Sequence, residues 1–203
     1  LFRSMAANEY EFLDEAELSD FPGLMAVSQF VRMLAEVPWF GGLGLELDGR
    51  EILLSEDYLL ALGFPDAYIS PVENWEEAAA AAANPDWNTE WWEAEEQVRV
   101  ALVSEACLKA DEETVMIALT HLQNQSIEAV LEPAELAAEA AGIEDEELIR
   151  AAAGAGAQAI YQAGLLLAAE NEDDEHHAFA LKYRLFESGR WPIGVVGNSF
   201  HIF

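Results

Sequence analysis

Two adjacent histidines in an acidic stretch offer the most recognisable chemistry in this sequence. His176 and His177 follow Asp173, Asp174 and Glu175, and imidazole and carboxylate groups can bind a divalent metal ion. Adjacent residues of a helix point about 100° apart, so the two imidazoles cannot easily share one ion. No HExxH or paired ExxH pattern accompanies them. We therefore predict a solvated, acid-rich helix N-terminus here, with no stoichiometric metal site and no cofactor.

A third histidine, His121, lies in a polar stretch that includes Asn124 one helical turn later. Such a patch could line a pocket, and Ser104 or Cys107 could act as a nucleophile by residue type. Because no spacing pairs either residue with His121, we predict a histidine at the core edge, hydrogen-bonded to a neighbouring helix. Cys107 lies in a helical apolar pattern, which predicts a buried, inert thiol. As the single cysteine it cannot form an intramolecular disulfide, which fits a reducing, cytoplasmic compartment.

Four tryptophans cluster near the middle of the chain, at Trp75, Trp87, Trp91 and Trp92. Aromatic rings of this kind can form a ligand-binding wall or a surface for a partner. The alternative, which we prefer, is that they pack in the core beneath a loop.

Scarce cations gather in the C-terminal quarter, at Lys182, Arg184 and Arg190, in a chain with only nine Lys and Arg residues. A partly buried cation without a partner is costly, so we predict that at least one pairs with a carboxylate of another helix. The following segment, 191–203, is too apolar to remain in water, and we predict that it packs onto the helices.

An anion site beside Trp191 is the functional alternative for these cations. Gly194 and Gly197 resemble the glycines of a phosphate-binding loop, but no helix follows them, so this signal is weak. We therefore favour ion pairs that fix the last helix.

Acidic residues dominate the composition, with 39 Asp and Glu against nine Lys and Arg and a net charge of −30. They recur along the whole chain, which predicts an acidic surface adapted to a salty cytoplasm. The alternatives are a merely acidic protein, or acids that serve a basic partner or imitate the phosphates of DNA. This charge repels duplex nucleic acid and anionic membranes, so we expect neither as a partner, and it attracts basic proteins.

Helices are the elements that must position these side chains. Apolar spacing and capping residues predict helices over about 22–37, 55–62, 78–83, 90–110, 112–130, 133–141, 146–169 and 175–187. The helix over 146–169 is rich in small residues, including Gly154, Gly156 and Gly164, which allow close approach of neighbours. We predict that it is the central helix of a bundle and not a membrane span.

Two segments carry turn signals. Residues 43–54 fit either a hairpin that turns at Asp48-Gly49 or a helix from Glu51 onward, and Ser55 could cap a helix behind the hairpin. Gly197-Asn198 lies between two apolar runs and predicts a hairpin near the C-terminus.

The sequence as a whole predicts a mainly α, single-domain helical bundle with one or two small β-hairpins. We divide it into an acidic N-terminal arm, 1–20, and a helical domain, 21–203. Hydrophobic residues make up 52%, which is enough for a sizeable core.

Because no catalytic constellation appears, we expect a non-enzymatic binding or assembly protein with a protein or small-molecule partner. The alternatives are a small hydrolase or metal-dependent enzyme that uses His121 or the His176-His177 segment, and a DNA mimic. A pocket with convergent polar groups would favour the enzyme, and exposed apolar surface would favour binding. Acids spaced like phosphates along one face would favour mimicry.

Overall fold

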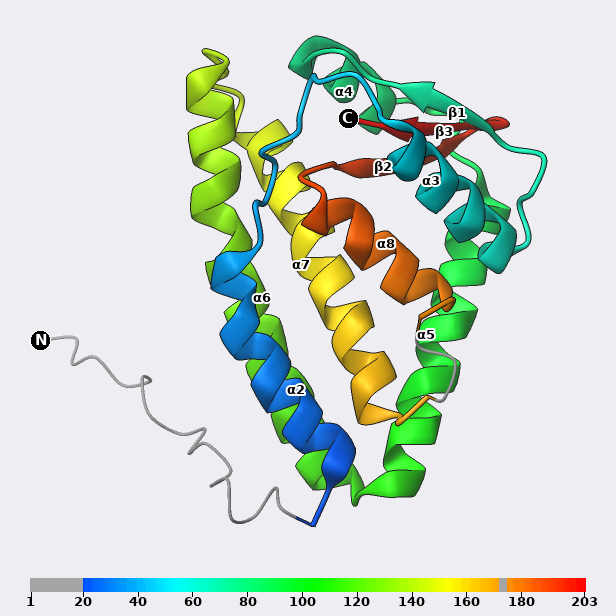
Figure 1. The fold of residues 1–203 in the computed structure, drawn as a ribbon, viewed down its shortest axis with the longest axis vertical. Coiled ribbons are helices and arrows are strands. Elements are labelled where there is room, and N and C mark those ends of the chain that lie inside the picture. Colours follow the sequence, from blue (N-terminus) through cyan, green and yellow to red (C-terminus); the bar gives the residue numbers. More distant parts are fainter. Residues whose placement is uncertain (1–19, 172–174) are drawn as a thin grey trace, which may run out of the picture.

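The computed structural model describes residues 20–171 and 175–203, and helices dominate this part of the chain (Figure 1). Its seven α-helices are α2 (Pro22–Met33), α3 (Gly49–Leu62), α4 (Trp75–Ala82), α5 (Thr89–Lys109), α6 (Glu112–Ala140), α7 (Glu146–Ala168) and α8 (Ala178–Glu187). A short 3-10 helix, η1 (Leu34–Glu36), follows α2. The mainly α single-domain prediction is confirmed. Of the predicted acidic arm, only Asp20 falls within the described residues.

The predicted central helix is confirmed, because α7 packs against α2, α5, α6 and α8 (Figure 1). Its glycines allow close approach at two points along α6. A Cβ on Gly164 would lie 2.2 Å from Leu122, and one on Gly156 would lie 3.2 Å from Val130. Gly154, by contrast, faces open space, so its predicted packing role is wrong.

Within the ambiguous segment 43–54, a helix begins at Gly49, and the alternative of a hairpin that turns at Asp48-Gly49 is wrong. Asp48 caps α3, because its carboxylate accepts hydrogen bonds from the backbone of Arg50 and Glu51 at 2.8 Å. The Glu51 carboxylate in turn accepts from the Asp48 backbone at 2.9 Å, which completes a capping box. Ser55 is no cap, since it is buried inside the helix and donates to the carbonyl of Glu51.

The predicted break before Pro133 is also wrong, because α6 continues through it. A proline removes one helical hydrogen bond and crowds the preceding turn, which usually ends or kinks a helix. Here the buried face of the helix carries on from Val130 through Ala134 to Ala138, all fully buried. Packing on α7 therefore outweighs the local preference of the proline.

A three-stranded sheet lies at one end of the helices, in the order β1-β3-β2 (Figure 1). Its strands are β1 (Tyr68–Pro71), β2 (Pro192–Val196) and β3 (Ser199–Ile202). β2 and β3 form the predicted hairpin about Gly197-Asn198. The parallel pairing of β1 with β3 joins two segments that are far apart in the sequence, and no sequence pattern predicted it.

None of the helices that the structure describes is both long enough and apolar enough to cross a bilayer.

Candidate functional site

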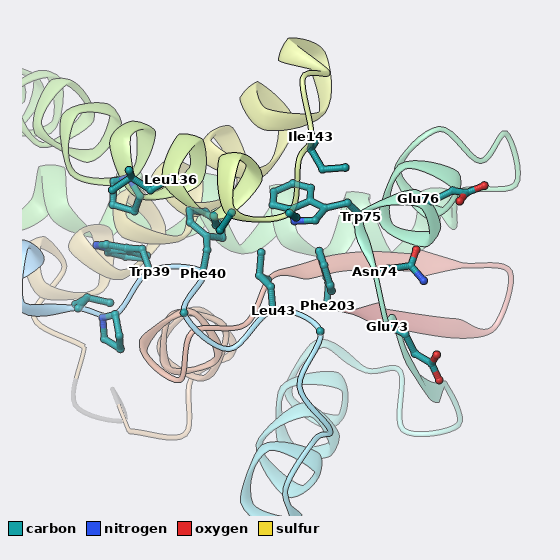
Figure 2. A pocket seen from close by; sticks show the side chains of 18 residues that line it. Trp39, Phe40, Leu43, Glu73, Asn74, Trp75, Glu76, Leu136, Ile143 and Phe203 are labelled. Carbon is teal, nitrogen blue, oxygen red and sulfur yellow. The ribbon is translucent and has the colours of Figure 1, made fainter.

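An apolar groove of about 870 Å³ opens between α6, residues 37–44 and the start of α4 (Figure 2). On the α6 side, Pro133, Leu136, Ala137 and Ala140 line it. Spacings of three and four residues place these side chains on one helical face. Leu136 is 57% exposed although it is large and apolar, so this face has no covering element.

The opposite wall is formed by residues 37–44, which follow η1 and contain Trp39 and Phe40. The indole N–H of Trp39 donates to the carbonyl of Leu34 at 3.0 Å, which fixes the ring against the end of η1. Phe40 has φ 59°, a left-handed conformation that is uncommon for residues other than glycine. Its ring is buried and meets Phe186 edge to face at 6.1 Å, and this packing holds the backbone in place.

Aromatic rings from distant parts of the chain form the floor. Trp75 packs edge to face on Phe203, with ring centroids 5.5 Å apart, and lies 6.1 Å from the ring of Trp191. The backbones of Trp191 and Phe203 exchange two hydrogen bonds, at 2.7 and 2.9 Å. The floor is therefore rigid and preformed, and the prediction that 191–203 packs onto the helices is confirmed.

Arg190 fixes the loop that continues from the groove wall. Its guanidinium makes a bidentate pair with Glu51 at 2.8 Å and donates to the carbonyls of Gly42, Leu45 and Glu46. The side chain is only 4% exposed. The predicted ion pair with a carboxylate of another helix is therefore confirmed, and it holds residues 42–46 as well as α3.

A second buried ion pair joins three helices. The carboxylate of Glu95 on α5 accepts hydrogen bonds from Lys182 of α8 at 2.7 and 2.9 Å and from the Tyr58 hydroxyl of α3 at 2.7 Å. The ammonium group also lies 5.8 Å from the ring centroid of Trp91. Burial, and then the negative charge of Glu95, raise the pKa of Tyr58 well above its ordinary value. Lys182 and Arg190 are thus held by buried carboxylates.

These contacts contradict the alternative of an anion site beside Trp191. Trp191 is 2% exposed, and the Arg190 guanidinium is fully engaged within the protein. Gly197 lies in the hairpin turn with φ 58°, which accounts for the glycine without a phosphate.

The charges at the groove are negative. Among the lining residues in the described part of the chain, the charged ones are Glu73 and Glu76. Figure 2 shows these two residues with Asn74 at one end of the groove, and Trp39 and Leu136 toward the other end. The groove is therefore apolar at one end and acidic at the other.

The histidines predicted at a helix start do lie there. The Nδ1 atom of His177 accepts a hydrogen bond from the Phe179 backbone at 3.1 Å and caps α8. Asp173 and Asp174 lie outside the described residues. Within the described ranges, no three His, Cys, Asp or Glu side chains are grouped so that they could hold a metal ion.

The candidates around His121 lie outside the groove lining. His121 is half-buried, and burial lowers its pKa. Ser104 is exposed and donates to the carbonyl of Val100 within its own helix at 3.0 Å. Cys107 is half-buried rather than buried, which corrects the prediction, although it packs against the core.

The tryptophan cluster divides between core and surface. Trp75 and Trp91 are buried, Trp87 is half-buried, and Trp92 is 58% exposed, so the core-packing prediction holds for only part of the cluster. Of the four, Trp75 lines the groove.

Most of the groove residues were not predicted as site residues from the sequence. Trp39 and Phe40 lie just after the predicted helix over about 22–37, and their part in the groove was missed. Their one sequence signal is a pair of large aromatic residues followed by Gly41 and Gly42, since adjacent glycines are typical of turns.

Three comparisons with known proteins gave no relative: no family model, no curated protein and no solved structure matches the chain.

Proposed function

We propose that this is a non-enzymatic binding protein that holds a segment of another protein in the groove between α6 and residues 37–44. The observation that carries this proposal is an apolar groove of about 870 Å³ with a preformed aromatic floor and an exposed leucine, Leu136, on its wall. Grooves with these properties bind apolar anchors of amphipathic segments.

The shape of the site favours a polypeptide segment over a small molecule. Pockets for small molecules bury most of the ligand surface. Along this groove Leu136, Ala140 and Ala141 are all exposed, so one side of any occupant stays in contact with solvent. A helix or extended segment with one apolar face suits such a site.

The lining residues support binding over hydrolysis. In the described part of the chain, the groove walls carry no histidine, cysteine, serine, threonine or lysine. The polar side chains at the groove are Glu73, Asn74 and Glu76, at one end only. They leave the apolar part of the groove without a nucleophile and base pair.

The acidic surface supports a second part of the proposal, that the protein works in a concentrated-salt cytoplasm. Like charges repel one another in dilute buffer, and the Debye length falls to about 3 Å at 1 M salt. We expect the melting temperature to rise between low and about 1 M chloride salt, by more than an uncharged osmolyte achieves. A flat or falling melting temperature would count against this setting.

The groove is tested by selecting peptides from a random display library against the full chain. Enriched peptides are then measured against the wild type, Leu136→Glu and the control Leu131→Glu. Leu131 is a partly exposed leucine on another face of α6, outside the groove. We expect Leu136→Glu to weaken binding about tenfold or more, since a buried leucine contributes about 1.5–3 kcal/mol.

Leu131→Glu should leave peptide affinity unchanged. Equal affinities for the two variants, or a selection that enriches no peptide, would contradict the proposed function.

A further inference from the structure

We infer that the segment held by the groove is amphipathic and basic, with an apolar anchor at one end and Lys or Arg side chains at the other. This inference rests on the proposed function and specifies its partner. The two ends of the groove differ in chemistry, and each end requires a matching feature in the occupant.

The apolar end selects the anchor. Trp39 and Leu136 flank it, and no charged group lies among its lining residues in the described part of the chain (Figure 2). A leucine or an aromatic side chain of the partner would remove the exposed surface of Leu136 from water.

The acidic end selects the cations. Glu73 and Glu76 are exposed, and within the described residues neither carboxylate has a hydrogen-bond or ion-pair partner. The neighbouring Glu77 differs, because its carboxylate accepts from the Glu73 backbone at 3.0 Å and from Asn74 at 3.2 Å. Two carboxylates thus remain available at the rim of an apolar groove.

The end of α6 adds to the same potential. The carbonyl end of a helix carries partial negative charge and attracts cations. The last turn of α6 contains no basic residue, and the groove lining includes Ala140 and Ala141 at this helix end. Ile143, just beyond, lies beside Trp75 on the acidic side of the groove in Figure 2. A cation bound at the acidic end of the groove would therefore interact favourably with the two carboxylates and with the carbonyl end of α6.

Net charge decides between the possible protein partners. A second copy of this chain also carries −30, and bringing two such surfaces together is opposed by repulsion. A basic partner is attracted at long range and can form short ion pairs at the rim. A segment with basic flanks therefore fits this surface better than a second copy does.

The test uses one amphipathic helical peptide with leucines spaced three and four residues apart, made with Lys, Gln or Glu at its flanking positions. Each peptide is titrated against the wild type, the Glu73→Gln/Glu76→Gln variant and the Glu93→Gln/Glu105→Gln variant. The last variant removes the same charge from exposed positions on α5, away from the groove.

With the wild type at about 0.15 M salt, we expect the Lys peptide to bind about threefold to tenfold more tightly than the Gln peptide. The Glu peptide should bind most weakly. The preference should disappear in Glu73→Gln/Glu76→Gln, persist in Glu93→Gln/Glu105→Gln, and shrink at about 1 M salt because the rim charges are then screened.

Equal binding of the three peptides to the wild type would overturn the inference and leave the proposed function intact. Equal loss of the preference in both double variants would overturn it too, because the attraction would then belong to the whole surface. If no peptide binds at either salt concentration, the proposed function fails.

Discussion

Two sets of acidic side chains in this protein have opposite environments. Glu51 and Glu95 are buried, and each binds a cation from the C-terminal part of the chain, Arg190 and Lys182 respectively. Both carboxylate oxygens of each are engaged. These two acids connect helices, and their burial keeps them away from an external ligand.

At the groove, Glu73 and Glu76 are exposed, and their carboxylates have no partner within the described residues. They lie beside exposed apolar surface, whereas the buried pairs lie within packed helices. The chain has 39 Asp and Glu residues but nine Lys and Arg residues, so most carboxylates cannot form an ion pair with a Lys or Arg of the same chain. The comparison shows that burial of the ion pair marks the acids that hold the fold, whereas Glu73 and Glu76 remain exposed at the rim of an apolar groove.

The largest expected effect comes from deleting the C-terminal segment, residues 191–203. Deleting residues 191–203 removes β2, β3 and the rings of Trp191 and Phe203 from the core. We expect a loss of at least about 5 kcal/mol, comparable to the whole stability of many domains. Thermal and urea denaturation measure it, and an unchanged melting temperature would show that the segment is dispensable.

Breaking one buried pair should have the next largest effect. Among the described residues, Lys182→Met leaves the buried Glu95 carboxylate with the Tyr58 hydroxyl as its remaining side-chain donor. An uncompensated buried charge costs about 3–5 kcal/mol, so the free energy of unfolding should fall by that amount. The double variant Lys182→Met/Glu95→Leu should recover much of the loss. If the single variant is as stable as the wild type in urea, the pair does not hold the helices together.

Alkaline pH should have a smaller effect on the cluster of Glu95, Lys182 and Tyr58. The folded-state pKa of Tyr58 is raised, so the unfolded chain releases its phenolic proton first, above a pKa of about 10. The contribution of Tyr58 to stability should therefore be constant below about pH 10 and fall above it, by up to about 1.4 kcal/mol per pH unit. Urea titrations at about pH 9 and 11 should show a smaller fall for Tyr58→Phe than for the wild type. If the wild type and Tyr58→Phe lose equal stability between these pH values, Tyr58 does not cause the loss.

The smallest effect is expected at an exposed ion pair. Arg150 and Glu146 form a contact on α7, but their side chains are 65% and 78% exposed. Exposed pairs contribute about 0–1 kcal/mol, so Arg150→Gln should change stability by no more than about 0.5 kcal/mol. A loss as large as that of Lys182→Met would mean that burial does not separate structural acids from the rest.

Local signals in the sequence were sufficient to predict much of the fold. The predicted helix over 146–169 begins at Glu146 behind the capping residue Asp145. The predicted helix over 175–187 ends at Glu187, before Gly189 with φ 83°, and Gly197-Asn198 forms the predicted hairpin turn. Each of these depends on a few neighbouring residues. The scarcity of cations likewise predicted that a C-terminal cation would be paired, although not which carboxylate it would find.

Features that depend on distant residues were missed. Pro133 remains within a helix because Ala134 and Ala138 pack on α7, and β1 pairs with β3, which lies far away in the sequence. The groove combines segments around Trp39, Trp75, α6 and Phe203, which are brought together only by the tertiary fold. No local pattern could have placed an exposed leucine of α6 opposite an aromatic turn some hundred residues earlier in the chain.

The central claim, that the groove binds while the buried pairs hold the fold, is tested most directly by measuring peptide affinity and stability on the same two variants. Leu136→Glu should lose about tenfold or more in affinity for a groove peptide and change the unfolding free energy by less than about 0.5 kcal/mol. Lys182→Met, measured below its melting temperature, should lose several kcal/mol of stability and keep the wild-type affinity. If Leu136→Glu binds as well as the wild type, or loses affinity only because it unfolds, the account is contradicted.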